Sequence, residues 1–344
     1  MKRFLIKLSY TILPMWLFTL AAVAYYYEGV VPYQTGDIGI LGKIPFGKFY
    51  NYDVVSKNRL PQTLRYTLIE HPDSLKNHTA DVLTVGDTFS QAKEYGYQNF
   101  LADEDEMLSV ANYCPIVWTH TNPIQTAYDL LKLGYADSAH YKTMVVQTAE
   151  RWLVLRLDEL KTTNKSLEAD HFMKKTKGTP TDDGWSIHET RNYLYLRLKI
   201  KEPIYEAKLD RKLFSSPRGD ELYFIDTDHY LLTIDDNIRQ KLKASYDSLT
   251  ALAKEKHVKL LFLVCPDKYD IYQDFIVGEH PKKTINEDFR TLIGNDSNLI
   301  IAKEQLLPLV NKGEKDIFFM NDTHWSCKSA AIMAKELARH ISRR

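Results

Sequence analysis

The chain is poor in cysteine and carries no excess of either charge. Its three cysteines, Cys114, Cys265 and Cys327, are an odd and widely spaced set, which fits neither a disulfide framework nor a CxxC metal site. Each is expected to be a small buried hydrophobe, although a bridge between Cys114 and Cys265 stays open if the domain is exported. The 45 basic and 45 acidic side chains cancel, with no internal block of Lys and Arg. This balance argues against a nucleic-acid partner.

Nucleotide-binding motifs are also missing. The sequence contains neither a P-loop nor a GxGxxG pattern, so neither ATP nor NAD is expected, and we predict no metal or other cofactor. The hydrophobic content of 44% is ordinary for a globular protein. A chain of this length can form one domain of roughly 250 to 300 residues, or two smaller ones.

The N-terminal segment has the features of an export signal. Three basic residues precede an uncharged run over residues 8–27, which is about the length that crosses a bilayer as a helix. The positive charges keep the N-terminus in the cytoplasm and place everything after Glu28 outside. Residues 1–28 are therefore predicted to be a cytoplasmic stub and transmembrane signal anchor in a bacterial-type inner membrane, with a periplasmic domain. A cleaved signal peptide is the alternative, because Ala22-Val23-Ala24 has the small-x-small form of a cleavage site.

Residues 29–80 contain scattered Gly and Pro and are predicted to be a spacer, so that the folded domain spans 81–344. At its start, residues 82–85 have the apolar pattern of a buried parallel strand, and Gly86 allows a tight turn into a helix. The hydroxyl of Thr88 or Ser90 would then lie at a helix N-terminus, where N–H groups can stabilise an oxyanion. An ordinary Asp or Thr helix cap is the competing interpretation.

A second candidate motif lies near the C-terminus. The apolar residues 317–320 are predicted to be a strand, which delivers Asp322 and His324 to the loop before a last helix over 328–341. An imidazole with a carboxylate that fixes its tautomer is the acid/base half of a Ser-His-Asp triad. Taken alone, the same residues also fit a capping Asp beside a surface His.

Together the two motifs resemble the first and last blocks of the SGNH (GDSL-like) hydrolase superfamily. The form Asp-Thr-His-Trp-Ser at 322–326 resembles the DHHW branch, which includes alginate O-acetyltransferases that modify secreted polysaccharide. The resemblance implies Thr88 as nucleophile, His324 as base, Asp322 as the group that orients it, and Trp325 as a supporting residue. One departure is that the family nucleophile is Ser, and the β-methyl group of Thr88 restricts χ1 and crowds an acyl intermediate.

The apolar strands support the same fold class. They fall at about 82–85, 144–148, 258–264, 299–301 and 317–320, separated by helical patterns. This alternation predicts an α/β fold with a doubly wound, mostly parallel sheet, in which residues 160–237 form a polar, irregular insertion. Within the insertion we expect a helix over 187–200 and a strand over 222–225. Its aromatic residues, with Trp185, Tyr193 and Tyr195, either line a sugar groove or are simply packed.

Two further segments contribute candidate supporting residues. Residues 143–148, followed by Glu150-Arg151, resemble the central strand of the family, and the resemblance implies Gln147 or Thr148 as an oxyanion donor. Glu150 and Arg151 equally fit a structural ion pair. After the strand at 258–264, Pro266-Asp267-Lys268-Tyr269 resembles the Pro-x-Lys segment of the polysaccharide acetyltransferases. Lys268 would orient substrate or hold a loop of the active site; an exposed turn lysine is the alternative.

These observations favour an extracytoplasmic O-acyltransferase, in which Thr88 takes an acyl group from a donor and passes it to a polysaccharide hydroxyl. By resemblance, a membrane-bound O-acyltransferase partner supplies the acyl groups. Two alternatives stay open: a carbohydrate esterase of the same fold, and a non-catalytic polysaccharide-binding or assembly protein with a degenerate nucleophile.

Overall fold

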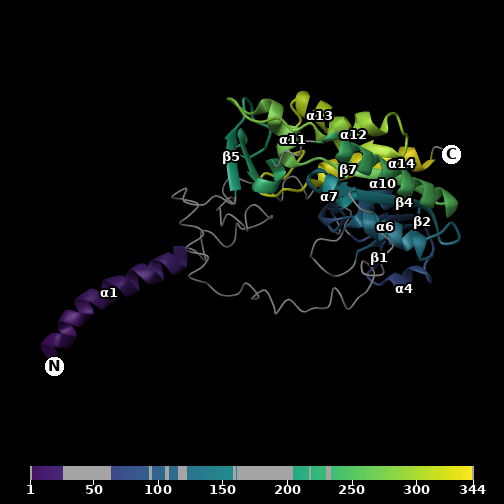
Figure 1. Cartoon of the computed structure of the whole chain (residues 1–344). Helices are drawn as coiled ribbons and strands as arrows, with labels where there is room; N and C mark the ends of the chain where they lie inside the picture. The colour runs from purple at the N-terminus through teal and green to yellow at the C-terminus, as the bar shows by residue number, and fades with distance from the viewer. Residues whose placement is uncertain are drawn as a thin grey trace.

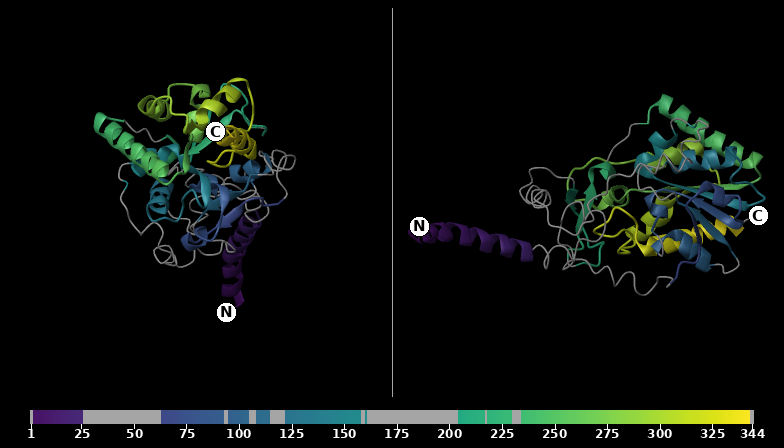
Figure 2. Two further views of the ribbon diagram at one scale, coloured as in Figure 1. Left: turned by 90° about the vertical axis from the view of Figure 1, so that its right-hand side faces the viewer. Right: turned by 90° about the horizontal axis from the view of Figure 1, so that it is seen from below.

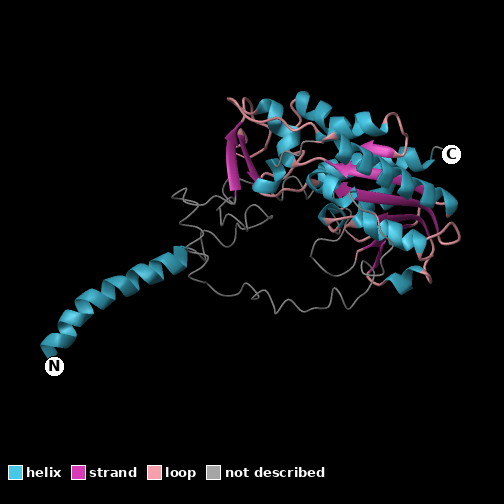
Figure 3. Cartoon of the chain, in the orientation of Figure 1, coloured by secondary structure: helices cyan, strands magenta, loops and turns pink. Residues whose placement is uncertain are grey.

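The computed structural model describes residues 2–25, 63–92, 95–104, 108–114, 122–157, 160, 204–216, 218–229 and 234–342. Its centre is a six-stranded sheet in the order β1-β3-β2-β4-β7-β8, in which every neighbouring pair is parallel (Figures 1 and 3). The strands are β1 (Thr67–Ile69), β2 (Ala80–Val85), β3 (Val110–Tyr113), β4 (Tyr141–Ala149), β7 (Lys259–Cys265) and β8 (Leu299–Ile301). The predicted α/β class with a mostly parallel sheet is confirmed.

Helices cover both faces of this sheet. One face packs against α5 (Tyr97–Glu104), α11 (Lys268–Tyr272), α13 (Ala302–Asn311) and α14 (Cys327–Ser342). The other packs against α4 (Pro72–Leu75), α6 (Pro123–Lys132), α7 (Leu153–Leu157), α10 (Asp236–Glu255) and α12 (Ile285–Ile293). In the right-hand view of Figure 2, the yellow C-terminal helix lies on the opposite side of the strands from the green α10.

The alternation of side chains along the strands explains the two cores. In β7, Leu261 and Leu263 enter the core beneath α14, whereas Leu260 and Phe262 enter the core beneath α10. Both sets are apolar because a parallel sheet with helices on both faces leaves neither side of a central strand in water. The strand consequently reads as a continuous apolar run.

Local signals define the helix ends. Asn122 caps α6 by accepting hydrogen bonds from the backbone N–H groups of Ile124 and Gln125, and Pro123 occupies the first turn. Gly134, at φ 72°, follows the end of the same helix in the left-handed conformation that glycine tolerates. Short 3₁₀ turns complete the element order: η4 (Thr88–Ser90), η6 (Glu150–Trp152), η8 (Asp226–His229) and η9 (Gln273–Phe275).

The strands predicted at 82–85, 144–148, 258–264 and 299–301 lie in β2, β4, β7 and β8, but the strand predicted at 317–320 is wrong. There the chain turns, and Phe318 forms only an isolated bridge with Trp325. The segment is apolar because it is a fully buried loop; Ile317, Phe318 and Met320 are 0% exposed. Burial without a neighbouring strand gives the same apolar pattern as a short strand.

The sheet also begins earlier than predicted. β1 and α4 lie within residues 29–80, which the sequence assigns to a spacer. β1 pairs with β3 at the edge of the sheet, and two of its three residues are exposed. A three-residue edge strand with one buried side chain gives almost no periodic signal.

An N-terminal helix, α1 (Lys2–Tyr25), is present at the predicted position. Within the part of the chain that the structure describes, however, no helix combines the length and the apolar character needed to cross a membrane. The structure therefore does not support the predicted transmembrane anchor.

The described part of the insertion is a separate hairpin of β5 (Ile204–Lys208) and β6 (Glu221–Ile225), which confirms the strand predicted at 222–225. The hairpin packs on α11 through Phe224 and Tyr269, whose ring centroids are 5.0 Å apart. The helix predicted at 187–200, and Trp185, Tyr193 and Tyr195, lie outside the described residues. All three cysteines are free thiols, so Cys114 and Cys265 form no bridge.

Candidate active site

The candidate site lies where the strand order reverses. The chain passes from β2 to β3 on one side and then to β4 on the other, so that β2 and β4 are neighbours with connections leaving in opposite directions. At such a switch point the loops at the carboxyl ends of the strands separate and leave a crevice for a ligand. Thr88 follows β2 and Glu150 follows β4 at this edge.

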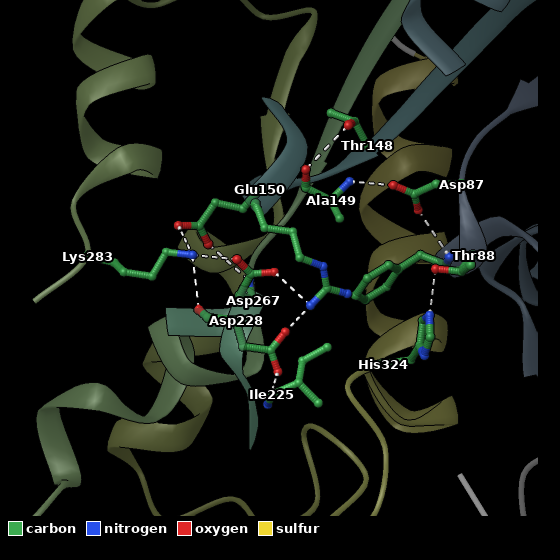
Figure 4. Close-up of polar contacts among 12 residues, drawn as sticks. Asp87, Thr88, Thr148, Ala149, Glu150, Ile225, Asp228, Asp267, Lys283 and His324 are labelled. Carbon is green, nitrogen blue, oxygen red and sulfur yellow. Dashed lines mark hydrogen bonds and ion pairs between the residues drawn. The ribbon is translucent and has the colours of Figure 1, made fainter. Parts of the chain in front are cut away.

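Three side chains form a hydrogen-bonded line at this edge. The Nε2 atom of His324 lies 2.7 Å from the Thr88 Oγ1, and its Nδ1 lies 2.6 Å from the Asp322 Oδ1. Figure 4 shows Thr88 and His324 facing each other across the switch point. Asp322 Oδ1 also accepts the backbone N–H of His324 at 2.9 Å, which fixes the carboxylate relative to the imidazole. The structure thus brings Thr88 into contact with His324, which lies 236 positions further along the chain and is two residues from Asp322.

Aromatic rings hold the imidazole in place. The ring of His324 packs against Phe89, with centroids 4.7 Å apart, and Phe89 in turn meets the edge of Trp325 at 5.2 Å. Trp325 is 3% exposed and also packs edge-on against Tyr97. Trp325 therefore supports the site by packing against Phe89 and Tyr97, rather than through contact with the Thr88 hydroxyl.

The hydroxyl groups of Thr88 and Ser90 have different surroundings. Thr88 is exposed, whereas Ser90 is 1% exposed and its Oγ donates to the Gln147 Oε1 at 2.8 Å and contacts the Tyr97 hydroxyl at 3.1 Å. Ser90 is therefore a structural hydroxyl. The expected helix after β2 is the three-residue turn η4, and the regular helix α5 begins only at Tyr97.

A buried carboxylate anchors the turn that carries Thr88. Asp87 accepts hydrogen bonds from the backbone N–H of Phe89 at 3.2 Å and of Ala149 at 2.7 Å, from the Gln147 amide at 2.8 Å, and from Arg156. Burial acts to raise the pKa of Asp87, but the Arg156 guanidinium and these hydrogen bonds outweigh it and hold that pKa below its ordinary value. Asp87 is therefore a buried carboxylate that stays ionised.

Gly86 is required by the close approach of two side chains. A Cβ at this position would lie 1.9 Å from the Ser90 Oγ and 2.5 Å from the Gln147 Oε1. Because glycine has no side chain, the end of β2 can pack closely against β4, and the Ser90–Gln147 hydrogen bond has room to form.

Gln147 and Thr148 have contacts that hold this turn. Both are 0% exposed. The Gln147 amide bonds to Asp87 and Ser90, and the Thr148 Oγ1 accepts from Arg156 at 2.7 Å and donates to the Ala149 carbonyl at 3.3 Å. These contacts place both residues beneath the turn that carries Thr88; their role as oxyanion donors stays a prediction.

Lys268 is fully buried, so its interpretation as an exposed turn lysine is wrong. Its ammonium group donates to the backbone carbonyls of Met320 at 2.7 Å and Asp322 at 3.2 Å, and lies 5.3 Å from the centre of the Phe214 ring. Lys268 therefore ties the loop that carries Asp322 to the first turn of α11, which agrees with the predicted loop-holding role.

A cluster of buried charges lies beside the site, and Figure 4 shows its acidic members with Lys283. Lys283 pairs with Glu150 and Asp267, and Arg151 pairs with Asp228 and Asp267. Glu150 and Arg151 thus both take part in structural ion pairs. Their partners are Lys283 for Glu150, and Asp228 and Asp267 for Arg151. Burial raises the pKa of Glu150 well above its ordinary value, with neighbouring carboxylates adding to the shift.

Arg156 contacts Asp87 in the turn that carries Thr88, and no motif of the sequence points to it. It lies within the apolar segment Leu153–Leu157, and its side chain is only 11% exposed. The available signal was this single cation in an apolar helix, which requires a buried anion as its partner.

A cavity between α12 and α13 is lined by Asn286, Arg290, Lys303 and Leu307 among others, and none of its lining residues belongs to the Thr88–His324–Asp322 line. Within the described ranges, no group of three or more His, Cys, Asp and Glu side chains could hold a metal ion.

The C-terminal part of the chain matches a known family. Residues 224–344 match the family described as the SGNH hydrolase-like domain of the acetyltransferase AlgX. This stretch includes Asp322, His324 and Lys268, whereas Thr88 lies outside it. The resemblance to SGNH-like polysaccharide O-acetyltransferases that the motifs indicate is confirmed.

A particular relative is the probable alginate O-acetylase AlgJ of Pseudomonas fluorescens. The chain is 30% identical to it over 150 residues, which are 40% of this chain and 37% of that protein. The match thus spans little more than a third of the length of this relative.

Proposed function

We propose that this protein is an O-acyltransferase that moves an acetyl group onto a polysaccharide hydroxyl through Thr88, His324 and Asp322. The observation that carries the proposal is the continuous hydrogen-bonded line from the Asp322 carboxylate through both nitrogens of His324 to the Thr88 Oγ1, with contacts of 2.6 and 2.7 Å. The resemblance to AlgX and to a probable alginate O-acetylase supports the choice of acyl group and acceptor.

In the first half-reaction, the Thr88 Oγ1 attacks the carbonyl carbon of the acyl donor while His324 Nε2 removes the hydroxyl proton. Asp322 holds the imidazole tautomer and stabilises the imidazolium that forms. The tetrahedral intermediate collapses as the proton passes from His324 to the leaving group of the donor. Thr88 then carries the acyl group as an ester.

In the second half-reaction, His324 removes a proton from a sugar hydroxyl, whose oxygen attacks the Thr88 ester. Collapse of this intermediate breaks the bond to the Thr88 Oγ1 and returns the proton to it. The backbone N–H of Thr88 and a nearby donor stabilise the oxyanion in both steps. The β-methyl group of Thr88 slows both half-reactions relative to Ser, because it limits the rotamers that reach the carbonyl.

Thr88 is exposed, and this supports the esterase alternative, because water reaches the same position as a sugar hydroxyl. A transferase therefore needs a bound acceptor that displaces water from the acyl-enzyme. The substituted nucleophile keeps the second alternative open, a polysaccharide-binding or assembly protein that has lost turnover.

We further propose an extracytoplasmic location and an acyl supply from a membrane-bound partner. The location is supported by the basic residues that precede the uncharged run at 8–27. A fusion of residues 1–40 to a reporter that is active only after export tests this location. Loss of the signal when the three basic residues are replaced by Glu supports it, and a reporter that stays inactive contradicts it.

The function is tested by turnover of 4-nitrophenyl acetate by the full chain, compared with Thr88→Ser, Thr88→Ala and His324→Ala. We expect the wild type to exceed His324→Ala and Thr88→Ala, and an added oligosaccharide acceptor to receive the acetyl group in preference to water. Preferential hydrolysis in the presence of acceptor favours the esterase. If only Thr88→Ser shows turnover above His324→Ala, the wild-type protein is not a catalyst.

A further inference from the structure

Asp87 is a carboxylate that three elements hold from different directions. It accepts the Phe89 N–H from η4, the Gln147 amide and the Ala149 N–H from β4, and the guanidinium of Arg156 from α7. An ionised carboxylate offers about four acceptor positions, so these donors use its capacity. A protonated carboxyl group would place an O–H against one of the donors, so only the ionised form satisfies the whole arrangement.

The cation that keeps this group ionised is Arg156. Asp87 is 5% exposed, and an unpaired carboxylate is strongly disfavoured in such a site. Two other titratable groups face it, the Cys265 thiol from β7 and the Tyr97 hydroxyl from α5. Burial raises the pKa of both, so both stay neutral near neutral pH and supply no charge. The balancing positive charge comes from Arg156.

The arrangement bears directly on the nucleophile. Asp87 precedes Thr88, and its bonds to Phe89 and Ala149 join the Thr88 turn to the end of β4. Arg156 also donates to the Thr148 Oγ1 at 2.7 Å, which fixes the guanidinium against the same strand end. A displacement of this turn would change the 2.7 Å contact between Thr88 and His324.

We infer that Arg156 is a positioning residue of the acyl-transfer site, which holds Asp87 as an anion so that Asp87 can fix the Thr88 turn in reach of His324. The inference rests on the proposed function. It assigns to Arg156 no contact with the substrate. Replacing Arg156 should therefore change kcat rather than KM, because a shift of about 1 Å in a reacting group costs up to about a hundredfold in rate.

The test uses the full chain with Arg156→Gln, Arg156→Lys and the double variant Asp87→Asn/Arg156→Gln. Arg339→Gln is the matched control, because Arg339 is 66% exposed and pairs with Glu336 towards the C-terminal end of α14, whereas Asp322 and His324 precede the N-terminal end of that helix. The melting temperature, and kcat and KM for 4-nitrophenyl acetate, are measured between pH 5 and 8, roughly the range in which most domains are stable.

The melting temperatures test the pairing without reference to activity. In the wild type the pKa of Asp87 is depressed, so its stabilising contribution is present above the unfolded-state pKa and adds no slope near neutral pH. Without Arg156, burial raises that pKa above the unfolded value, and stability is lost as the pH rises through it. Arg156→Gln should therefore fall further below the wild type at higher pH, and the double variant should lose this pH dependence.

The kinetics test the positioning role. We expect Arg156→Gln to lower kcat by roughly tenfold to a hundredfold with little change in KM, and Arg156→Lys to recover most of the loss. If Arg156→Gln matches Arg339→Gln in kcat and in the pH dependence of melting, the inference is wrong while the proposed function stands. If the wild type shows no turnover above His324→Ala, the proposed function fails, and the melting series alone decides whether Arg156 holds Asp87 ionised.

Discussion

Replacing Asp322 with Asn tests whether the Asp–His contact does the chemical work assigned to it. The substitution keeps the size of the side chain and an oxygen that can accept the His324 backbone N–H, which Asp322 accepts at 2.9 Å. It removes the charge 2.6 Å from the His324 Nδ1. The geometry of the loop should therefore survive while the stabilisation of the imidazolium is lost.

The expected size of the effect follows from the partial exposure of the pair. The side chains of His324 and Asp322 are 25% and 20% exposed. Two unit charges about 4 Å apart interact by about 4 kcal/mol at an effective dielectric constant near 20 and by about 1 kcal/mol in water. A partly solvated pair falls between these values, at roughly 3 kcal/mol, which corresponds to about a hundredfold in kcat.

The assay is the pH dependence of kcat for 4-nitrophenyl acetate with the full chain. Glu314→Gln is the matched control, because Glu314 is a carboxylate on the same approach to α14, pairs with Lys328, and is 48% exposed. We expect Asp322→Asn to lose about a hundredfold in kcat and Glu314→Gln to lose almost nothing. A kcat for Asp322→Asn within about threefold of the control would refute the reasoning, because the pair would then contribute less than 1 kcal/mol.

Three further predictions concern the supports of the site. Lys268→Met removes the ammonium donor from the buried Met320 carbonyl and the partly buried Asp322 carbonyl and should cost about 1 to 3 kcal/mol of unfolding free energy, measured by urea titration; an unchanged midpoint contradicts the loop-holding role. Gly86→Ala places a methyl group 1.9 Å from the Ser90 Oγ and should cost at least about 1 to 3 kcal/mol in the same titration, whereas a neutral effect would mean that the turn adapts freely. Glu150 has a raised pKa in the folded state, so its contribution to stability is full below the unfolded-state value and is lost as the pH rises through the raised one. Glu150→Gln should remove this loss and flatten the melting temperature against pH above about pH 4, and an unchanged slope contradicts a raised pKa of Glu150.

Much of the fold follows from the sequence because the central strands are buried on both faces. β7 reads as a continuous apolar run, and its α/β setting follows from the helical patterns on either side. The edge strand β1 gives no such signal, since only Ile69 among its residues is buried. Residues 317–320 mislead for the opposite reason: a buried loop is as apolar as a buried strand.

The contact between Asp322 and His324 could be predicted from their motif, because a spacing of two residues places both side chains on one turn. The contacts beneath Thr88 could not be found in this way. Asp87 and Arg156 are 69 positions apart and meet only because β4 and α7 fold back over the end of β2. Lys268 was ambiguous for the same reason, since its burial depends on the loop at 316–322 and on Phe214 from the insertion.

The central claim is that Thr88 carries the acyl group, and the most direct measurement is the mass of the protein after mixing with 4-nitrophenyl acetate and quenching in acid. We expect one added acetyl group, located by peptide mapping on the peptide that contains Thr88. This label should be absent from Thr88→Ala and strongly reduced in His324→Ala. Turnover by the wild type with no label on that peptide, or equal labelling in Thr88→Ala, would mean that Thr88 does not carry the acyl group.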